Sequence, residues 1–183
     1  MAVMDWTDGD ARAHLSRVRN LPEARLCEVA RSYDWGRYPE TVLGWIMAQK
    51  CLDLDTALAA FFAGVPERFN YLHKREVPPE FAGQCRVLDN ICLRVNSGFY
   101  LPRPQAETRS HEALAKWLAV QDIDRREGAA GRWVFDETIV MPLLSRGEGI
   151  EVAAPLPEIA EQPTRAGGPL ARLSGLLRLR TAR

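Results

Sequence analysis

The side chains that most often carry chemistry, cysteine and histidine, are few in this chain and form no recognised motif. They are Cys27, Cys51, Cys85 and Cys92, and His14, His73 and His111. No two cysteines have the C-x-x-C spacing typical of zinc and redox sites. His111-Glu112 is not followed by a histidine four residues later, so the zinc-protease pattern is absent. We therefore expect no catalytic residue, no metal ligand and no cofactor.

Two interpretations of these residues stay open. Each cysteine lies among apolar neighbours in a helical pattern, which favours buried, reduced thiols. A nucleophilic cysteine–histidine pair is the alternative, because the two side chains need only meet in space. His14 is expected on a solvated helix face, and His73 in an exposed run of charged residues. Asp89-Asn90 is expected either to face solvent or to make a structural hydrogen bond.

A turn rich in aromatic and charged residues is the strongest candidate for a binding site. In the structural interpretation, Trp35 fixes the angle between two helices and Asp34 caps the turn between them. In the functional interpretation, aromatic and charged side chains together form a ligand or partner surface. That surface would consist of Tyr33, Asp34, Trp35, Arg37, Tyr38 and Glu40.

Helical periodicity places this turn in a mainly α fold. The pattern predicts a compact bundle or array of about six helices, with at most a short β-hairpin near residues 132–141. An irregular packed segment is the alternative there. The first predicted helix ends at Asn20, and the second runs from Pro22 to the break at Trp35. The third starts at Pro39, and the fourth starts at a cap on Asp53 or Asp55. The fifth and sixth cover about residues 80–96 and 105–120. Gly64 is expected to stop the fourth helix in the left-handed conformation.

Three segments follow from this pattern. Residues 1–141 form the helical domain, and residues 142–168, rich in proline and glycine, form a linker. Residues 169–183 are predicted to be a basic amphipathic helix that binds a partner. The residues expected to do so are Leu170, Arg172, Leu173, Leu176, Leu177, Arg178 and Arg180.

Composition excludes several classes of partner. The 183 residues carry a formal net charge of zero, which gives no overall field to hold nucleic acid. The charge is uneven, because the chain after residue 159 has five arginines and one glutamate, a net +4. The first ten residues lack the apolar core of a signal peptide, and no apolar run has the length of a membrane span. We therefore expect a cytoplasmic protein.

One stretch resembles a known family. Tyr33-Asp34-Trp35, then Pro39, then Cys51-Leu52-Asp53-Leu54-Asp55-Thr56-Ala57-Leu58 and Phe61-Phe62 resemble DUF4274, a family of small bacterial helical domains without assigned chemistry. The resemblance covers about residues 20–101, and Val95 to Tyr100 looks like the end of the same domain. The chain departs from the family in the residues after Trp35 and in the inserted Leu52. The resemblance implies a helical fold and no reaction.

The function expected from the sequence is therefore an interaction and not a reaction. The leading hypothesis is a non-enzymatic protein-interaction module of a bacterial cytosolic protein. Its partner would be another protein, or a second copy held through the C-terminal helix. The alternative is a small ligand-binding or enzymatic domain that uses a pocket around Tyr33, Trp35 and Tyr38.

Overall fold

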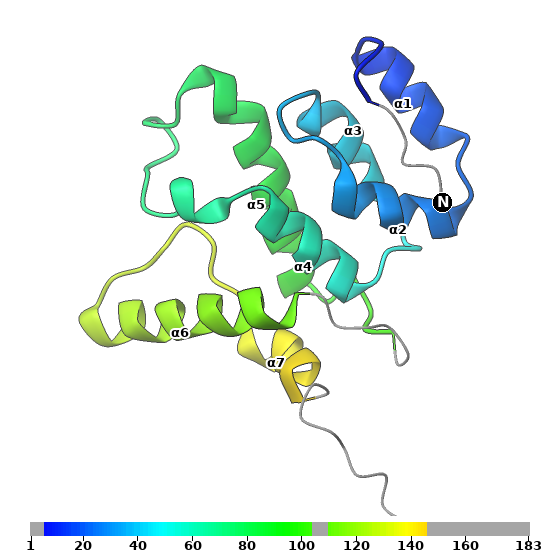
Figure 1. Cartoon of the computed structure of the whole chain (residues 1–183). Coiled ribbons are helices and arrows are strands. Elements are labelled where there is room, and N and C mark those ends of the chain that lie inside the picture. The colour runs from blue at the N-terminus through cyan, green and yellow to red at the C-terminus, as the bar shows by residue number, and fades with distance from the viewer. Residues whose placement is uncertain (1–5, 104–109, 146–183) are drawn as a thin grey trace, which may run out of the picture. The chain divides into compact units, whose positions relative to one another are not determined.

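The described part of the chain is helical. In a computed structural model, residues 6–103 and 110–145 are described, and all of them belong to one unit within residues 1–150 (Figure 1). They contain seven α-helices: α1 (Ala11–Arg19), α2 (Glu23–Ser32), α3 (Pro39–Ile46), α4 (Leu54–Ala63), α5 (Ala82–Asn96), α6 (His111–Glu127) and α7 (Glu137–Ser145). Two 3-10 helices, η1 (Pro66–Arg68) and η2 (Pro79–Phe81), lie between α4 and α5. The mainly α prediction is confirmed.

Side-chain caps and a proline set where several helices start. The carboxylate of Asp10 accepts a hydrogen bond from the Ala13 amide at 2.8 Å, which satisfies one of the free amides at the start of α1. Asp53 caps α4 in the same way, accepting from the Thr56 amide at 2.7 Å. Pro39 occupies the first turn of α3, as the sequence predicted.

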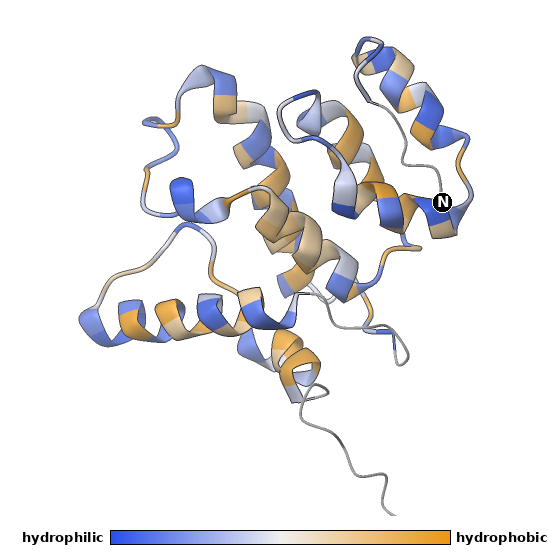
Figure 2. Ribbon diagram, in the orientation of Figure 1, coloured by the Kyte–Doolittle hydropathy of each residue, from blue (hydrophilic) through white to orange (hydrophobic). Residues whose placement is uncertain are grey.

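Helix α4 lies at the centre of the core. Seven of its ten residues are buried, and Figure 2 shows that it carries little hydrophilic colour compared with α1 and α6. It packs against α2 and α5, while α3 packs against α1 and α5. Phe61 of α4 makes edge contacts with Trp117, Trp133 and Phe135, at ring-centroid distances of 5.6, 5.9 and 4.9 Å. These contacts join α6 and the segment before α7 to the core.

The sequence left two alternatives near residues 132–141, at most a short β-hairpin or an irregular packed segment; the structure has the irregular segment, followed by a seventh helix. Trp133 and Phe135 are buried in an irregular segment, and α7 starts at Glu137. Asp136 accepts hydrogen bonds from the amide and the hydroxyl of Thr138, at 2.9 and 2.7 Å, which favours helix over strand. Helix α7 continues through Pro142 to Ser145, so the first four residues of the predicted linker are helical.

Gly64 ends α4, but not for the reason predicted. Its φ is −77°, and the left-handed residue is Val65, with a φ of 46°. A Cβ on Gly64 would lie 2.9 Å from both the Trp35 ring and Leu88. Glycine is therefore needed at this position for space and not for backbone freedom.

Helix α6 is longer than predicted at its C-terminal end. It extends to Glu127 and stops at Gly128, whose φ of 71° gives the left-handed cap typical of glycine. Its predicted start at residue 105, the remainder of the predicted linker and the predicted C-terminal helix lie outside the described residues. Within the described residues, no helix is both long enough and apolar enough to cross a membrane.

Candidate functional site

The predicted surface divides into a buried part and an open part. Tyr33 is only 3% exposed, and burial raises the pKa of its hydroxyl to about 12. Trp35, Arg37, Tyr38 and Glu40 instead line a groove, which Tyr33 and Asp34 do not line. Tyr33 therefore belongs to the core. The predicted surface combined this buried residue with residues that line an open groove.

The partner that holds Tyr33 in the core is His14, which the sequence wrongly placed on a solvated face. His14 is fully buried, with Nδ1 2.9 Å from the Tyr33 hydroxyl and Nε2 3.1 Å from the Asp8 carbonyl. A carbonyl only accepts, so Nε2 carries a proton and donates to Asp8, and in the neutral imidazole Nδ1 then accepts from the Tyr33 hydroxyl. Trp6 packs against both rings. The four-residue spacing of His14 and the buried Val18 on one helix face was the signal for this burial.

The indole of Trp35 lies at the base of the groove, next to the α2–α3 turn. It packs on the end of α4 and on α5, where Gly64 and Leu88 lie beside the ring. The Asp34 carboxylate accepts from the Gly36 amide at 2.8 Å, which confirms the predicted cap at this turn. Trp35 therefore packs the turn against the end of α4, close to Leu88 of α5.

The groove beside Trp35 is open and has a volume of about 510 Å³. It lies between the α2–α3 turn, which continues into α3, and the segment formed by η2 and the start of α5. Its lining combines three aromatic rings with polar and charged side chains. These residues include Trp35, Arg37, Tyr38, Glu40, Thr41, Glu80, Phe81 and Gln84.

The charges at this groove are largely neutralised by neighbours. Glu40 accepts two hydrogen bonds from Arg86, at 2.6 and 2.7 Å, and this contact lowers the pKa of the Glu40 carboxyl. Arg37 lies 3.7 Å from the Asp34 carboxylate. Arg68 stacks on Phe81, with 4.0 Å between the guanidinium carbon and the ring centroid. The groove therefore offers flat aromatic surface beside two paired charges, those of Glu40 and Arg37.

The described residues do not assemble a nucleophile–base pair. Each histidine ring has its hydrogen bonds with Tyr33 and Asp8, with the Arg75 amide, or with the Leu144 carbonyl, and not with cysteine. Burial raises the pKa of the Cys51, Cys85 and Cys92 thiols, that of Cys92 to about 12. All four cysteines are reduced, and three are buried. The geometry thus favours the buried-thiol interpretation.

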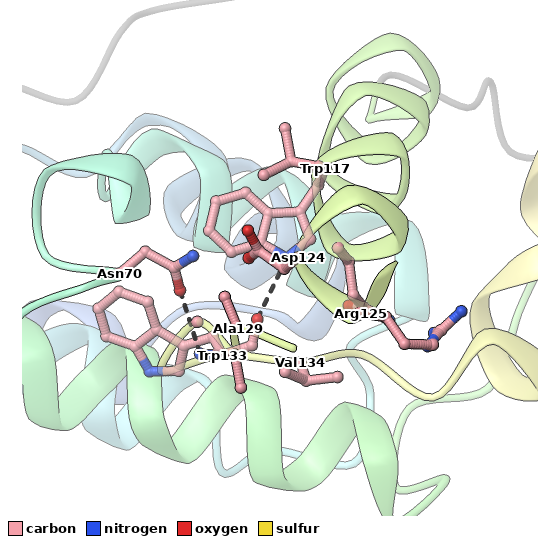
Figure 3. A pocket seen from close by; sticks show the side chains of 11 residues that line it. Asn70, Trp117, Asp124, Arg125, Ala129, Trp133 and Val134 are labelled. Carbon is pink, nitrogen blue, oxygen red and sulfur yellow. Dashed lines mark hydrogen bonds between the residues drawn. The ribbon is translucent and has the colours of Figure 1, made fainter. Parts of the chain in front are cut away.

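A second concave site was not predicted from the sequence. It has a volume of about 150 Å³ and lies between α6 and the loop that follows it (Figure 3). In Figure 3, Trp117 comes from α6, and Ala129, Trp133 and Val134 come from the segment facing it. The alternation of buried Trp133 and Phe135 with exposed Val134 was the local signal for this wall, but no local signal shows that it folds back onto α6, the helix just before it.

Asp89 of α5 holds the segment around Trp133 in place through hydrogen bonds. Its carboxylate accepts from Arg132 at 2.9 and 2.8 Å and from the Trp133 indole at 2.9 Å. This confirms a structural hydrogen bond for Asp89, one of the two roles expected from the sequence. The contact explains how a segment without regular structure holds the Trp133 side chain in a fixed position.

The start of α4 carries the most deeply buried charges. Asp53 and Asp55 are each 3% exposed, and Arg31 lies 3.9 and 3.8 Å from their carboxylates. Asp55 accepts from the amide and the hydroxyl of Ser110, at 3.1 and 2.6 Å. Arg31 also donates to the Thr56 hydroxyl at 2.5 Å. These contacts tie α2, α4 and the start of α6 together, which is a structural role.

Comparisons of the chain with family models, curated proteins and solved structures give no further information on these sites. No family model, no curated protein and no solved structure matches the chain.

Proposed function

We propose that the chain is a non-enzymatic protein-interaction module, and that the groove beside Trp35 is a binding surface of its helical domain. The observation that carries the proposal is the lining of the groove, which is aromatic and polar, with Glu40 and Arg37 already paired with neighbouring charges. Aromatic side chains with surrounding polar groups are typical of protein interfaces. A groove of about 510 Å³ accommodates a few side chains of a partner.

The alternative function is a small enzyme or ligand-binding domain that uses a pocket around Tyr33, Trp35 and Tyr38. Tyr33 is instead in the core with its pKa raised to about 12, so it does not exchange a proton near neutral pH. Glu40, which does line the groove, is held ionised by Arg86. These observations favour interaction over reaction.

The proposal extends to the rest of the chain on sequence grounds. We propose a DUF4274-like domain over about residues 20–101, supported by the Trp35 turn, the Pro39 start and the Asp53 cap. The basic, leucine-rich residues 169–183 would supply a second contact, to another protein or to a second copy. We also propose, from the sequence alone, a bacterial cytoplasmic location.

The test is a comparison of two arginine substitutions in the full chain. Thr41→Arg places a long cationic side chain in the groove, whereas Ser16→Arg does so on the exposed face of α1. We expect proteins that co-purify with the wild type in the native host to be lost with Thr41→Arg and kept with Ser16→Arg. Equal recovery by both variants would contradict a role for the groove.

Deletion of residues 165–183 tests the second contact separately. The linker composition predicts that the shortened chain keeps the melting temperature of the helical domain and loses a partner. A large drop in melting temperature would show that these residues contribute to the core of the fold instead.

A further inference from the structure

The pocket between α6 and residues 129–134 shares no residue with the groove beside Trp35. Its volume of about 150 Å³ is below that of a drug-sized ligand site and comparable to that of a cavity that takes a single ring. We propose that it binds one uncharged, leucine-sized side chain of a protein partner, with a cationic side chain of the same partner beside Asp124.

Three polar side chains that line the pocket already have hydrogen bonds within the protein. The Trp117 indole donates to the Trp133 carbonyl at 3.3 Å. The Gln121 amide both donates to and accepts from the Phe135 backbone, each at 2.9 Å. Asn70 accepts from the Trp133 amide at 3.2 Å, a contact drawn in Figure 3. A polar ligand group beside these three side chains would therefore lose its water without gaining a partner, whereas an apolar group has no hydrogen bond to lose.

The mouth of the pocket indicates a protein partner and not a free small molecule. Val120 and Val134, which line the pocket, are 44% and 43% exposed. A lone ring inside the pocket would leave both side chains in water, while the backbone around an inserted side chain would cover them. An anchor in a pocket with an apolar rim that excludes water is typical of the central part of an interface.

Charge complementarity defines the second part of the partner. Residues 120–137 contain five acids and three arginines, a net −2. The arginines already have acidic partners: Arg125 pairs with Glu137, Arg126 with Asp122, and Arg132 with Asp89. Asp124 takes its hydrogen bonds from an uncharged donor, the Tyr71 hydroxyl, at 2.9 and 3.1 Å. A lysine or arginine beside the anchor would therefore meet an acid that the described arginines do not neutralise.

The experiment uses the full chain and three short probes: N-acetyl-Leu-Arg-amide, N-acetyl-Leu-Glu-amide and N-acetyl-Gly-Arg-amide. Binding is followed by the shifts of the Val120 and Val134 backbone amides in nitrogen–proton correlation spectra. We expect the leucine–arginine probe to give the largest shifts. Replacing leucine by glycine should reduce binding about tenfold, the loss expected for one buried aliphatic side chain. Replacing arginine by glutamate should reduce it about threefold.

Three variants connect these shifts to the pocket. Ala129→Leu fills the pocket, Asp124→Asn removes the charge but keeps an acceptor for Tyr71, and Ala119→Leu adds the same bulk on an exposed part of α6 outside the pocket. We expect the first to abolish the shifts, the second to equalise the leucine–arginine and leucine–glutamate probes, and the third to match wild type. Absence of shifts in the wild type, or equal shifts with the glycine probe, would overturn the proposal. Equal shifts with the two leucine probes in the wild type would overturn its charged part.

Discussion

The start of α4 and the groove beside Trp35 each contain a carboxylate paired with an arginine, but the two pairs differ in their exposure to water. At the start of α4, Asp55 and Arg31 meet where the carboxylate is almost entirely shielded from water. At the groove, Glu40 and Arg86 meet with more than half of each side chain exposed. The buried contact connects helices, whereas the exposed one borders a surface that a partner can reach. Burial, and not residue type, separates the structural acid from the available one.

The largest effect should follow from removal of the buried acid. Asp55→Ala leaves the Ser110 amide and hydroxyl without their acceptor and leaves Arg31 without one of its carboxylates. We expect a loss of about 3 kcal/mol in the free energy of unfolding, measured by urea denaturation. Asp55→Asn keeps an oxygen for Ser110 and should lose distinctly less. Equal stability of Asp55→Ala and wild type would show that this contact is not a structural joint.

A smaller effect is expected at the floor of the groove. Gly64→Ala places a Cβ 2.9 Å from the Trp35 ring and Leu88, so the ring must shift, at a cost of about 1–3 kcal/mol. Gly44→Ala is the matched control, because it lies within α3 with no heavy atom within 4 Å of the added Cβ. It should stabilise the protein by up to about 1 kcal/mol through helix propensity. Thermal unfolding of both variants checks the opposite signs, and a destabilised Gly44→Ala would contradict the packing argument.

The same two regions show which parts of the fold were predictable. Caps and helix starts are local, so Asp53 and Pro39 were recognised from neighbouring residues. Asp55 was considered only as an alternative cap for its own helix, yet it binds Ser110, 55 residues later. The environment of His14 depends on Tyr33, 19 residues away, and was predicted wrongly. Contacts between distant segments have no periodic signature, which explains these errors.

The candidate sites show the same difference between local and long-range contacts. Four of the six residues predicted around Trp35 line the groove, because the turn itself brings them together. The pocket beside Trp117 was missed, because its two walls meet through side-chain contacts, such as that of Trp117 with Trp133 and those of both rings with Phe61. Helix α7 was missed because Thr138, Ile139 and Val140 favour strand by residue type. The cap from Asp136 and the burial of Val140 and Leu143 determine the helix instead.

The smallest effect should come from the exposed pair at the groove. Arg86 lowers the pKa of Glu40 below its ordinary value of 4.5. The stabilisation from this pair is therefore present above about pH 4.5 and is lost as the pH falls through the lowered pKa of the folded state. Glu40→Gln removes it at every pH, and we expect its melting temperature at pH 7 to stay within about 2 °C of wild type, because exposed pairs contribute little. The two proteins should converge further when melting is measured below pH 4. A loss of stability at pH 7 as large as that of Asp55→Ala would show that exposure does not separate the structural acid from the exposed one. A difference in melting temperature between Glu40→Gln and wild type that grows at acidic pH would contradict the assigned direction of the pKa shift of Glu40.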